Sequence, residues 1–361
     1  MEVVDVAIVG GGPAGSTCAA FCAAAGLRTL VLEREKFPRE KVCGDCINPA
    51  CWPVLKKLEL AEQLWNSPHG ALNMVEFIAT GGQKLRVDLP RGDKSEIAIK
   101  RSLLDNILLN RARTLGAEIR EEATLIALDR TAAKNWKIDI VREIFVARVV
   151  VGADGRNSTV ARLRNLLPRP ERERVALQAH IPLPPGFGNR IVLQFLPEGY
   201  SGQAPVNNSE LNLCLVGTPP TISSLRNWAG REFNLTAEQP WRTITPLTRT
   251  PISVTQENLF FIGDAARVVE PFTGEGIYYA LRSGELAASA IIKIIHGGDR
   301  ENVVREFTRA HRAMYRGRLW INRLARAAVL SPKTASRFLR VARFSPVALR
   351  LMTRKIVRRG D

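Results

Sequence analysis

The feature that most constrains the fold is a glycine-rich turn between two short apolar stretches at the start of the chain. The run Val3–Val9 is rich in β-branched residues and predicts a fully buried parallel strand. Small, helix-forming residues follow over Ala14–Ala25, and Gly26 is placed to end that helix. A second apolar stretch, Thr29–Leu32, predicts another strand. A strand, a helix and a parallel strand in this order indicate an α/β fold.

The glycines of this turn have the spacing G-x-G-x-x-G, and each has a physical role. Gly10 allows the tight turn, Gly12 lets the backbone approach a pyrophosphate, and Gly15 lets the helix pack closely on the strand. The free N–H groups at the helix start attract phosphate. Glu33, at the end of the second strand, is placed to hydrogen-bond ribose hydroxyls. The pattern predicts a Rossmann-like dinucleotide site but does not choose between NAD and FAD.

Composition limits the class of protein. The 361 residues suffice for about two domains, and no run of eighteen apolar residues is present, so no transmembrane helix is expected. The N-terminus leads directly into the first strand and leaves no room for a signal peptide, which predicts a cytoplasmic protein. Six cysteines in such a chain do not suggest a disulfide framework. Cys43-x-x-Cys46 has no second pair, so no metal site is expected.

Two later stretches favour a flavin over a nicotinamide nucleotide. A predicted strand ends in the Gly152–Gly155 turn, which contains Asp154. A second buried strand ends at Gly263 and is followed by Asp264, whose carboxylate can accept hydrogen bonds from a sugar-alcohol chain. Farther on, Gly274 and Gly276 allow the backbone to lie against a flat ligand. The next helix, predicted over Gly276–Ile295, then points its N-terminus at the ligand, where it would stabilise the negative charge of a reduced flavin.

These motifs, in order and spacing, resemble the FAD-dependent oxidoreductases with the p-hydroxybenzoate hydroxylase-like fold. The segment KVCGD at Lys41–Asp45 and the later EPFTGEGIYYALRSGELAA most resemble the geranylgeranyl reductase group. The resemblance covers roughly residues 2–165 and 259–288, and it implies FAD contacts at Ala14, Glu33, Cys43, Gly44, Arg101, Ala123, Asp264, Gly276 and Ile277. The motifs themselves add Gly10, Gly12, Pro13, Gly15, Arg34, Asp154, Gly263, Pro271 and Gly274 to the predicted cofactor site.

The middle of the chain follows the family less well. These reductases carry an aromatic-rich strand ending in Phe-Pro, where this chain has the stretch Leu193–Gly202. The Trp-x-Trp-x-Ile-Pro signature of the related flavin-dependent halogenases is absent from the sequence, so halogenation is not expected.

The expected fold is α/β, or α+β overall. A Rossmann-like FAD-binding domain is built from residues 1–75, 101–174 and 251–295. An inserted, largely antiparallel substrate sheet takes 76–100 and 175–250, and 296–361 form a basic helical region. Amphipathic spacing predicts one helix over Val54–Leu64. A second helix is predicted over Ser102–Leu115, with Ser102 as its N-cap and Gly116 as its stop.

Three reactions fit a flavin site with an apolar substrate. Our first expectation is a geranylgeranyl reductase-like reduction of a double bond in a small-molecule or lipid substrate, with NADPH, NADH or another reductant as electron donor. The alternatives are hydroxylation of an aromatic or polyketide-like substrate, and electron transfer to a membrane quinone. Cys43 either assists proton transfer or fills space beside the flavin, and Tyr200 either lines the substrate pocket or faces solvent. His180 and His311 have no carboxylate partner visible in the sequence and receive no role.

Most of the net charge of +17 lies at the C-terminal end, where the segment from Arg300 to Asp361 contains seventeen Lys or Arg residues and three acidic ones. Arginines and apolar residues alternate there at helical spacing. Such helices either bind an anionic membrane surface, which would place the protein on the inner face of the membrane, or turn their arginines to water. No nucleic-acid motif is present, and the sequence carries no signal for an oligomeric state.

Overall fold

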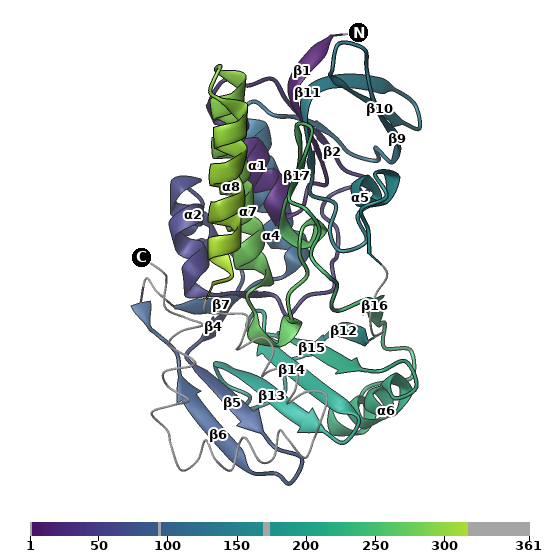
Figure 1. The fold of residues 1–361 in the computed structure, drawn as a ribbon. Helices are drawn as coiled ribbons and strands as arrows, with labels where there is room; N and C mark the ends of the chain where they lie inside the picture. Colours follow the sequence, from purple (N-terminus) through teal and green to yellow (C-terminus); the bar gives the residue numbers. More distant parts are fainter. Residues whose placement is uncertain (1, 93–94, 169–173, 317–361) are drawn as a thin grey trace.

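The computed structural model describes residues 2–92, 95–168 and 174–316. It consists of a helix-covered sheet packed against a second, curved sheet (Figure 1). Most of the basic C-terminal segment, on which the prediction of membrane contact rests, lies outside the described residues. Within the described ranges, no helix has both the length and the apolar character needed to cross a membrane.

Strands from residues 3–152 and 255–261 form an eight-stranded sheet whose centre is parallel. Its main strand order is β17 (Thr255–Gln256), β18 (Leu259–Phe261), β11 (Ile144–Gly152), β1 (Val3–Val9), β2 (Thr29–Leu32) and β8 (Glu118–Arg120). Two antiparallel strands extend it: β10 (Trp136–Ile140) pairs with β11, and β9 (Leu125–Arg130) pairs with β10. The predicted βαβ unit is therefore present at the expected residues, and the mixed α/β fold class is confirmed.

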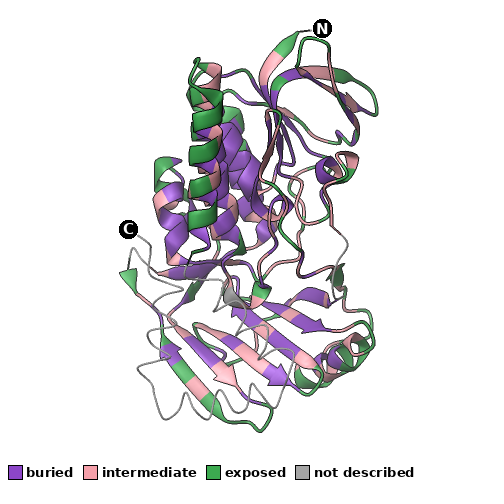
Figure 2. Cartoon of the chain, viewed as in Figure 1, coloured by how far each residue is buried: buried purple, intermediate pink, exposed green. Residues whose placement is uncertain are grey.

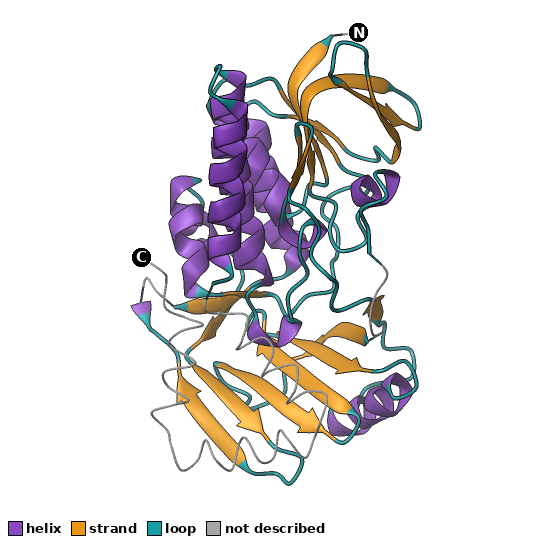
Figure 3. Ribbon diagram, in the orientation of Figure 1, coloured by secondary structure: helices purple, strands orange, loops and turns teal. Residues whose placement is uncertain are grey.

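One face of this sheet is covered by a layer of helices, which Figure 3 shows as a bundle beside the strands. These are α1 (Pro13–Ala24), α4 (Arg101–Thr114), α7 (Gly276–Ile295) and α8 (Arg300–Met314). The small residues of α1 have a packing reason, because this helix lies between the sheet and α7. A Cβ added at Gly284 of α7 would lie 2.5 Å from the carbonyl oxygen of Ala14. Only a glycine permits this approach of the two helices.

The second sheet has seven strands, in the order β16 (Arg242–Ile244), β12 (Val175–Pro182), β15 (Glu210–Gly217), β14 (Gly199–Pro205), β13 (Arg190–Leu196), β5 (Met74–Ile78) and β6 (Lys84–Asp88). All its pairs are antiparallel except β13 with β5. One face packs on α6 (Ile222–Glu232), and the opposite face is turned toward the first sheet. Figure 2 shows that both sheets keep their buried residues in the interior and that α6 and α8 expose one side.

Three short strands lie between the two large sheets and pair only with one another: β3 (Cys46–Ile47), β4 (Gly70–Leu72) and β7 (Glu96–Ala98). The segment 76–100, expected in the substrate sheet, thus contributes β6 and most of β5 to that sheet, while β7 belongs to this small one.

Two predicted helices differ from the structure. Val54–Leu64 is split between α2 (Trp52–Lys57) and α3 (Ala61–Asn66), because the backbone turns at Glu59, whose φ is +59°. Ser102 is not an N-cap: α4 begins at Arg101 with Lys100 at the cap position, and no side chain caps it. The predicted end of this helix is correct, since Gly116 follows α4 with a φ of +102°. A short helix after the Asp154 turn, α5, spans Thr159–Leu163.

Candidate active site

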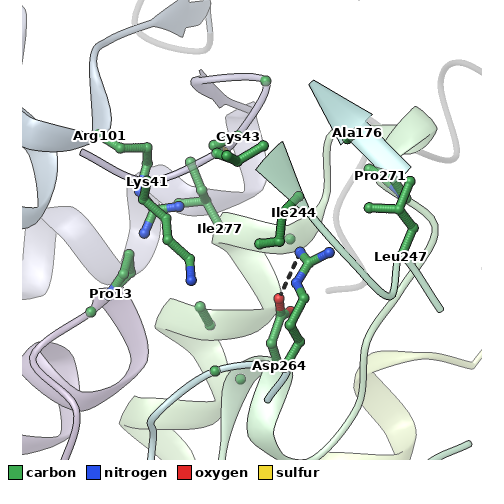
Figure 4. Close-up of a pocket in the computed structure, with 18 of the residues that line it drawn as sticks. Pro13, Lys41, Cys43, Arg101, Ala176, Ile244, Leu247, Asp264, Pro271 and Ile277 are labelled. Carbon is green, nitrogen blue, oxygen red and sulfur yellow. Dashed lines mark hydrogen bonds and ion pairs between the residues drawn. The ribbon is translucent and has the colours of Figure 1, made fainter. Parts of the chain in front are cut away.

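A cavity of about 810 Å³ lies where the two large sheets face each other. Pro13 and Lys41 line one side of the cavity. Ile244, at the end of β16, and Leu247, just after that strand, line the other side (Figure 4). With one exception, the residues predicted from the motifs and the resemblance all line this cavity: Gly10, Gly12, Pro13, Ala14, Glu33, Arg34, Cys43, Gly44, Arg101, Ala123, Asp154, Gly263, Asp264, Pro271, Gly274, Gly276 and Ile277, together with Tyr200.

The exception among these residues is Gly15, which lies behind the cavity wall. A Cβ there would lie 1.9 Å from the carbonyl oxygen of Gly10, so Gly15 serves the close packing of helix on strand. Gly10 itself has a φ of +104°, and its added Cβ would lie 2.6 Å from the oxygen of Ala153. Gly12 is different, because the nearest atom to its added Cβ is Nη2 of Arg39 at 3.5 Å. The backbone at Gly12 is therefore open toward the cavity.

The two acidic residues beside this turn hold backbone groups. The Glu33 carboxylate accepts the N–H of Gly11 at 2.8 Å and the N–H of Glu35 at 2.9 Å. Asp154 accepts the N–H groups of Thr159 and Val160 at 2.6 and 3.1 Å and so caps α5. Both side chains fix the loops that bound the cavity, in addition to lining it.

Positive charge is concentrated on the cofactor side of the cavity. Lys41, Arg39, Arg101 and Arg156 all line it. Burial, reinforced by the neighbouring charges of Arg101 and Arg156, lowers the pKa of Lys41 to about 8, although Asp264 opposes this. A site that crowds cations together in this way fits a bound diphosphate, whose negative charge would relieve the repulsion. None of Lys41, Arg39 and Arg156 was among the predicted site residues, although Lys41 begins the KVCGD segment.

Asp264 lines the next part of the cavity wall. Arg156 donates to its carboxylate at 3.1 Å (Figure 4), and Arg249 donates to its backbone carbonyl at 2.8 Å. Gly274, with a φ of +65°, ends the 3₁₀ turn Pro271–Thr273, and α7 begins at Gly276 as predicted. The N-terminus of α7 therefore lies at the cavity wall, which suits a ligand that becomes negatively charged.

The substrate side of the cavity is aromatic and aliphatic. Phe272 has its ring centroid 6.4 Å from that of Phe77, 5.7 Å from that of Phe195 and 5.4 Å from that of Tyr200. Tyr200 is 3% exposed, so of its two interpretations the position on the cavity wall fits the structure and a solvent-facing position does not. These rings offer a large apolar surface to a ligand.

His180 does have a carboxylate partner, contrary to the expectation from sequence. Its Nε2 lies 2.8 Å from Oδ2 of Asp45, and both side chains are nearly or fully buried. Asp45 follows the Cys43 loop with a φ of +60°, and its carbonyl accepts the N–H of Ile99 at 2.9 Å. On the neighbouring strand, Asn212 donates to the Cys43 carbonyl at 2.8 Å. The second sheet thus holds the Cys43 loop against the cavity from two points.

We expect His180→Ala to lower the free energy of unfolding by about 3 kcal/mol, because it leaves the Asp45 carboxylate buried without its partner. The visible spectrum of the bound flavin should shift as well, since the Cys43 loop loses an attachment. Urea unfolding and absorbance spectroscopy would measure both effects. His296→Ala, at an exposed position after α7, is the matched control. Equal unfolding free energies for the two variants would contradict the role of this pair.

Comparison with known proteins agrees with this geometry. Residues 3–181 match the FAD binding domain family. Menaquinone reductase of Mycolicibacterium smegmatis is 30% identical over 315 residues, covering 79% of this chain and 75% of that protein. Geranylgeranyl diphosphate reductase of Rhodobacter capsulatus is 30% identical over 316 residues, covering 81% and 76%. Conditioned medium factor receptor 1 of Dictyostelium discoideum is 27% identical over 333 residues, and the chain spans 65% of its length.

Among solved structures, the myxobacterial chondrochloren halogenase CndH has a TM-score of 0.78 at 21% identity, covering 90% of this chain and 82% of that one. A likeness at this identity concerns the fold. The fold, the cavity and the matched domain define an FAD-dependent oxidoreductase with the p-hydroxybenzoate hydroxylase-like architecture. Within this class the chain belongs to the geranylgeranyl reductase group.

Proposed function

We propose that the protein reduces a carbon–carbon double bond of an apolar, prenyl-type substrate. The observation that carries the proposal is the aromatic wall around Phe272, which lines the same continuous cavity as the residues of the cofactor site. An apolar chain lying on this wall would be shielded from water beside the reacting group. The names of the two 30% identical relatives, a menaquinone reductase and a geranylgeranyl diphosphate reductase, support a substrate of this kind.

FAD supplies the redox chemistry when it is bound, and the chain orients it. We assign its diphosphate to the open backbone at Gly12 and the adjacent start of α1, near Lys41 and Arg39. The N-terminus of α7 at Gly276 would receive the pyrimidine edge of the ring. NADPH, NADH or another reductant is proposed as the electron donor.

Cys43 is our candidate for proton transfer in this reaction. It lines the cavity, and burial raises the pKa of its thiol, although Arg101 opposes this. A thiol that keeps its proton can donate it, whereas a thiolate cannot. This chemistry matches a reduction, in which one hydrogen of the pair arrives as a proton.

The test uses the FAD-loaded enzyme reduced with dithionite without oxygen and mixed with geranylgeraniol. We expect the visible absorbance of oxidised flavin to return while the product gains two hydrogen atoms by mass spectrometry. Cys43→Ala should slow this turnover by about 100-fold, the usual contribution of a positioned acid. No reoxidation with any prenyl alcohol or prenyl quinone would contradict the proposal.

The same assay separates the alternatives. A product that gains one oxygen atom, formed only in air, would identify a hydroxylase. Turnover with a short-chain quinone that returns only its two-electron-reduced form, with every prenyl double bond intact, would identify electron transfer to quinone. Either result would replace the proposed double-bond reduction.

A further inference from the structure

One buried carboxyl group on the cavity wall is unused by the cofactor site. Glu96 lies on β7, is 7% exposed and lines the cavity. Among the described residues its carboxyl group makes no hydrogen bond or ion pair. The other buried carboxylates in these ranges each have a hydrogen-bond partner within the fold: Glu33, Asp45, Glu76, Asp105, Glu270 and Glu275. Glu96 is therefore the one buried acid here whose partner has to come from elsewhere.

Its surroundings are apolar. Glu96 is paired directly with Leu72 of β4, and it shares the face of β7 that carries Ala98. Ala98 packs in a cluster with Val75 and Leu89, at the junction of the small sheet and the larger sheet. Val75 and Leu89 also line the cavity, so the carboxyl group opens into its apolar part.

A buried carboxyl group without a partner is unstable in its charged form. Burial raises the pKa of Glu96 to about 7. Below that pH the group is mainly neutral, and its O–H can donate a hydrogen bond to an oxygen atom. Above it the carboxylate can only accept, and it repels any anion brought into the same apolar space.

We propose that Glu96 binds the polar end of the substrate, and that this end is a neutral oxygen function, a carbonyl or hydroxyl group, rather than a diphosphate. The inference rests on the proposed function, because it takes the cavity to hold an apolar prenyl-type chain. It narrows that function, since it selects prenyl alcohols, aldehydes or quinones over prenyl diphosphates. The position of the carboxyl group in the cavity, the burial of its side chain and its lack of a partner within the described residues together support this role.

Three probes with the same apolar body test it: farnesal with a carbonyl group, farnesene with no polar end, and farnesyl diphosphate. Binding to the FAD-loaded enzyme is measured by ultrafiltration and mass spectrometry. At pH 6 we expect the wild type to bind farnesal about tenfold more tightly than farnesene or the diphosphate, the equivalent of one buried hydrogen bond. Raising the pH to 8.5 should weaken farnesal binding, because the carboxylate no longer donates.

Two variants and one control complete the experiment. Glu96→Leu should bring farnesal and farnesene within about twofold of each other, whereas Glu96→Gln should keep the preference and remove its pH dependence. Asp88→Asn, at an exposed acid on β6, should match the wild type. Unchanged FAD content shows that each variant is folded. A farnesal preference that survives Glu96→Leu would overturn the role of Glu96 alone, whereas failure of every probe to bind the wild type would also overturn the proposed function.

Discussion

Gly12→Val is expected to give a folded protein that retains no FAD. A Cβ at this position meets nothing closer than 3.5 Å, and that atom is the end of the flexible Arg39 side chain, so the fold itself tolerates it. The added valine methyl groups would instead fill the space at the start of α1 that the pyrophosphate needs. We expect the affinity for FAD to fall by more than about 100-fold, since a side chain in that space prevents several contacts between the pyrophosphate and the backbone at once. The ratio of flavin absorbance to protein, measured after purification and after incubation with FAD, gives the result.

Two other glycines provide the comparison. Gly230→Ala, on α6 where an added Cβ meets nothing within 4 Å, should retain FAD and the wild-type circular dichroism spectrum. Gly15→Ala should lose folded protein instead, because its Cβ would overlap the Gly10 oxygen at 1.9 Å. A yellow Gly12→Val protein with wild-type flavin content would place the pyrophosphate somewhere else.

The sequence predicts the cofactor half of this protein well because its signals are local. Gly10 at the first turn and Gly274 just before α7 both have a positive φ, so each turn depends on a residue without a Cβ. Such conformational requirements can be inferred from the few residues around each glycine. The bounds of α7 agree with the predicted Gly276–Ile295 for the same reason.

The features that escaped prediction depend on contacts between distant segments. Asp45 and His180 are 135 positions apart, and no local pattern connects them. Within Val54–Leu64 the apolar spacing continues past the turn at Glu59, because Leu58 and Leu60 on either side both enter the core. The sequence around Glu96 gives no sign that this strand residue is buried, as it is in the folded protein. Each of these features depends on tertiary packing between distant segments, and the periodicity of the sequence carries no information about such packing.

Arg174→Met is expected to lower the free energy of unfolding by about 3–5 kcal/mol, the usual cost of leaving one member of a buried ion pair alone. The Arg174 guanidinium donates to both oxygens of Glu270, at 3.1 and 2.6 Å, and the two residues are 3% and 4% exposed. Arg174 directly precedes β12, and Glu270 directly precedes the Pro271–Thr273 turn. The pair therefore attaches the turn at the cofactor wall to the second sheet, and its loss should also weaken FAD binding. Urea unfolding of the FAD-loaded protein and FAD titration measure both effects.

The double variant Arg174→Met with Glu270→Leu distinguishes an ion pair from simple packing. If the cost of the single change comes from a buried carboxylate that has lost its ion pair with Arg174, removing that carboxylate should restore part of the lost stability. Arg28→Met is the control, since its pair with Glu2 is exposed and should contribute less than about 1 kcal/mol. A double variant as unstable as the sum of its two single variants would contradict the pairing. Recovery of stability without recovery of FAD affinity would show that the polar contact is needed to position the turn, because apolar side chains can fill the same space without fixing its orientation.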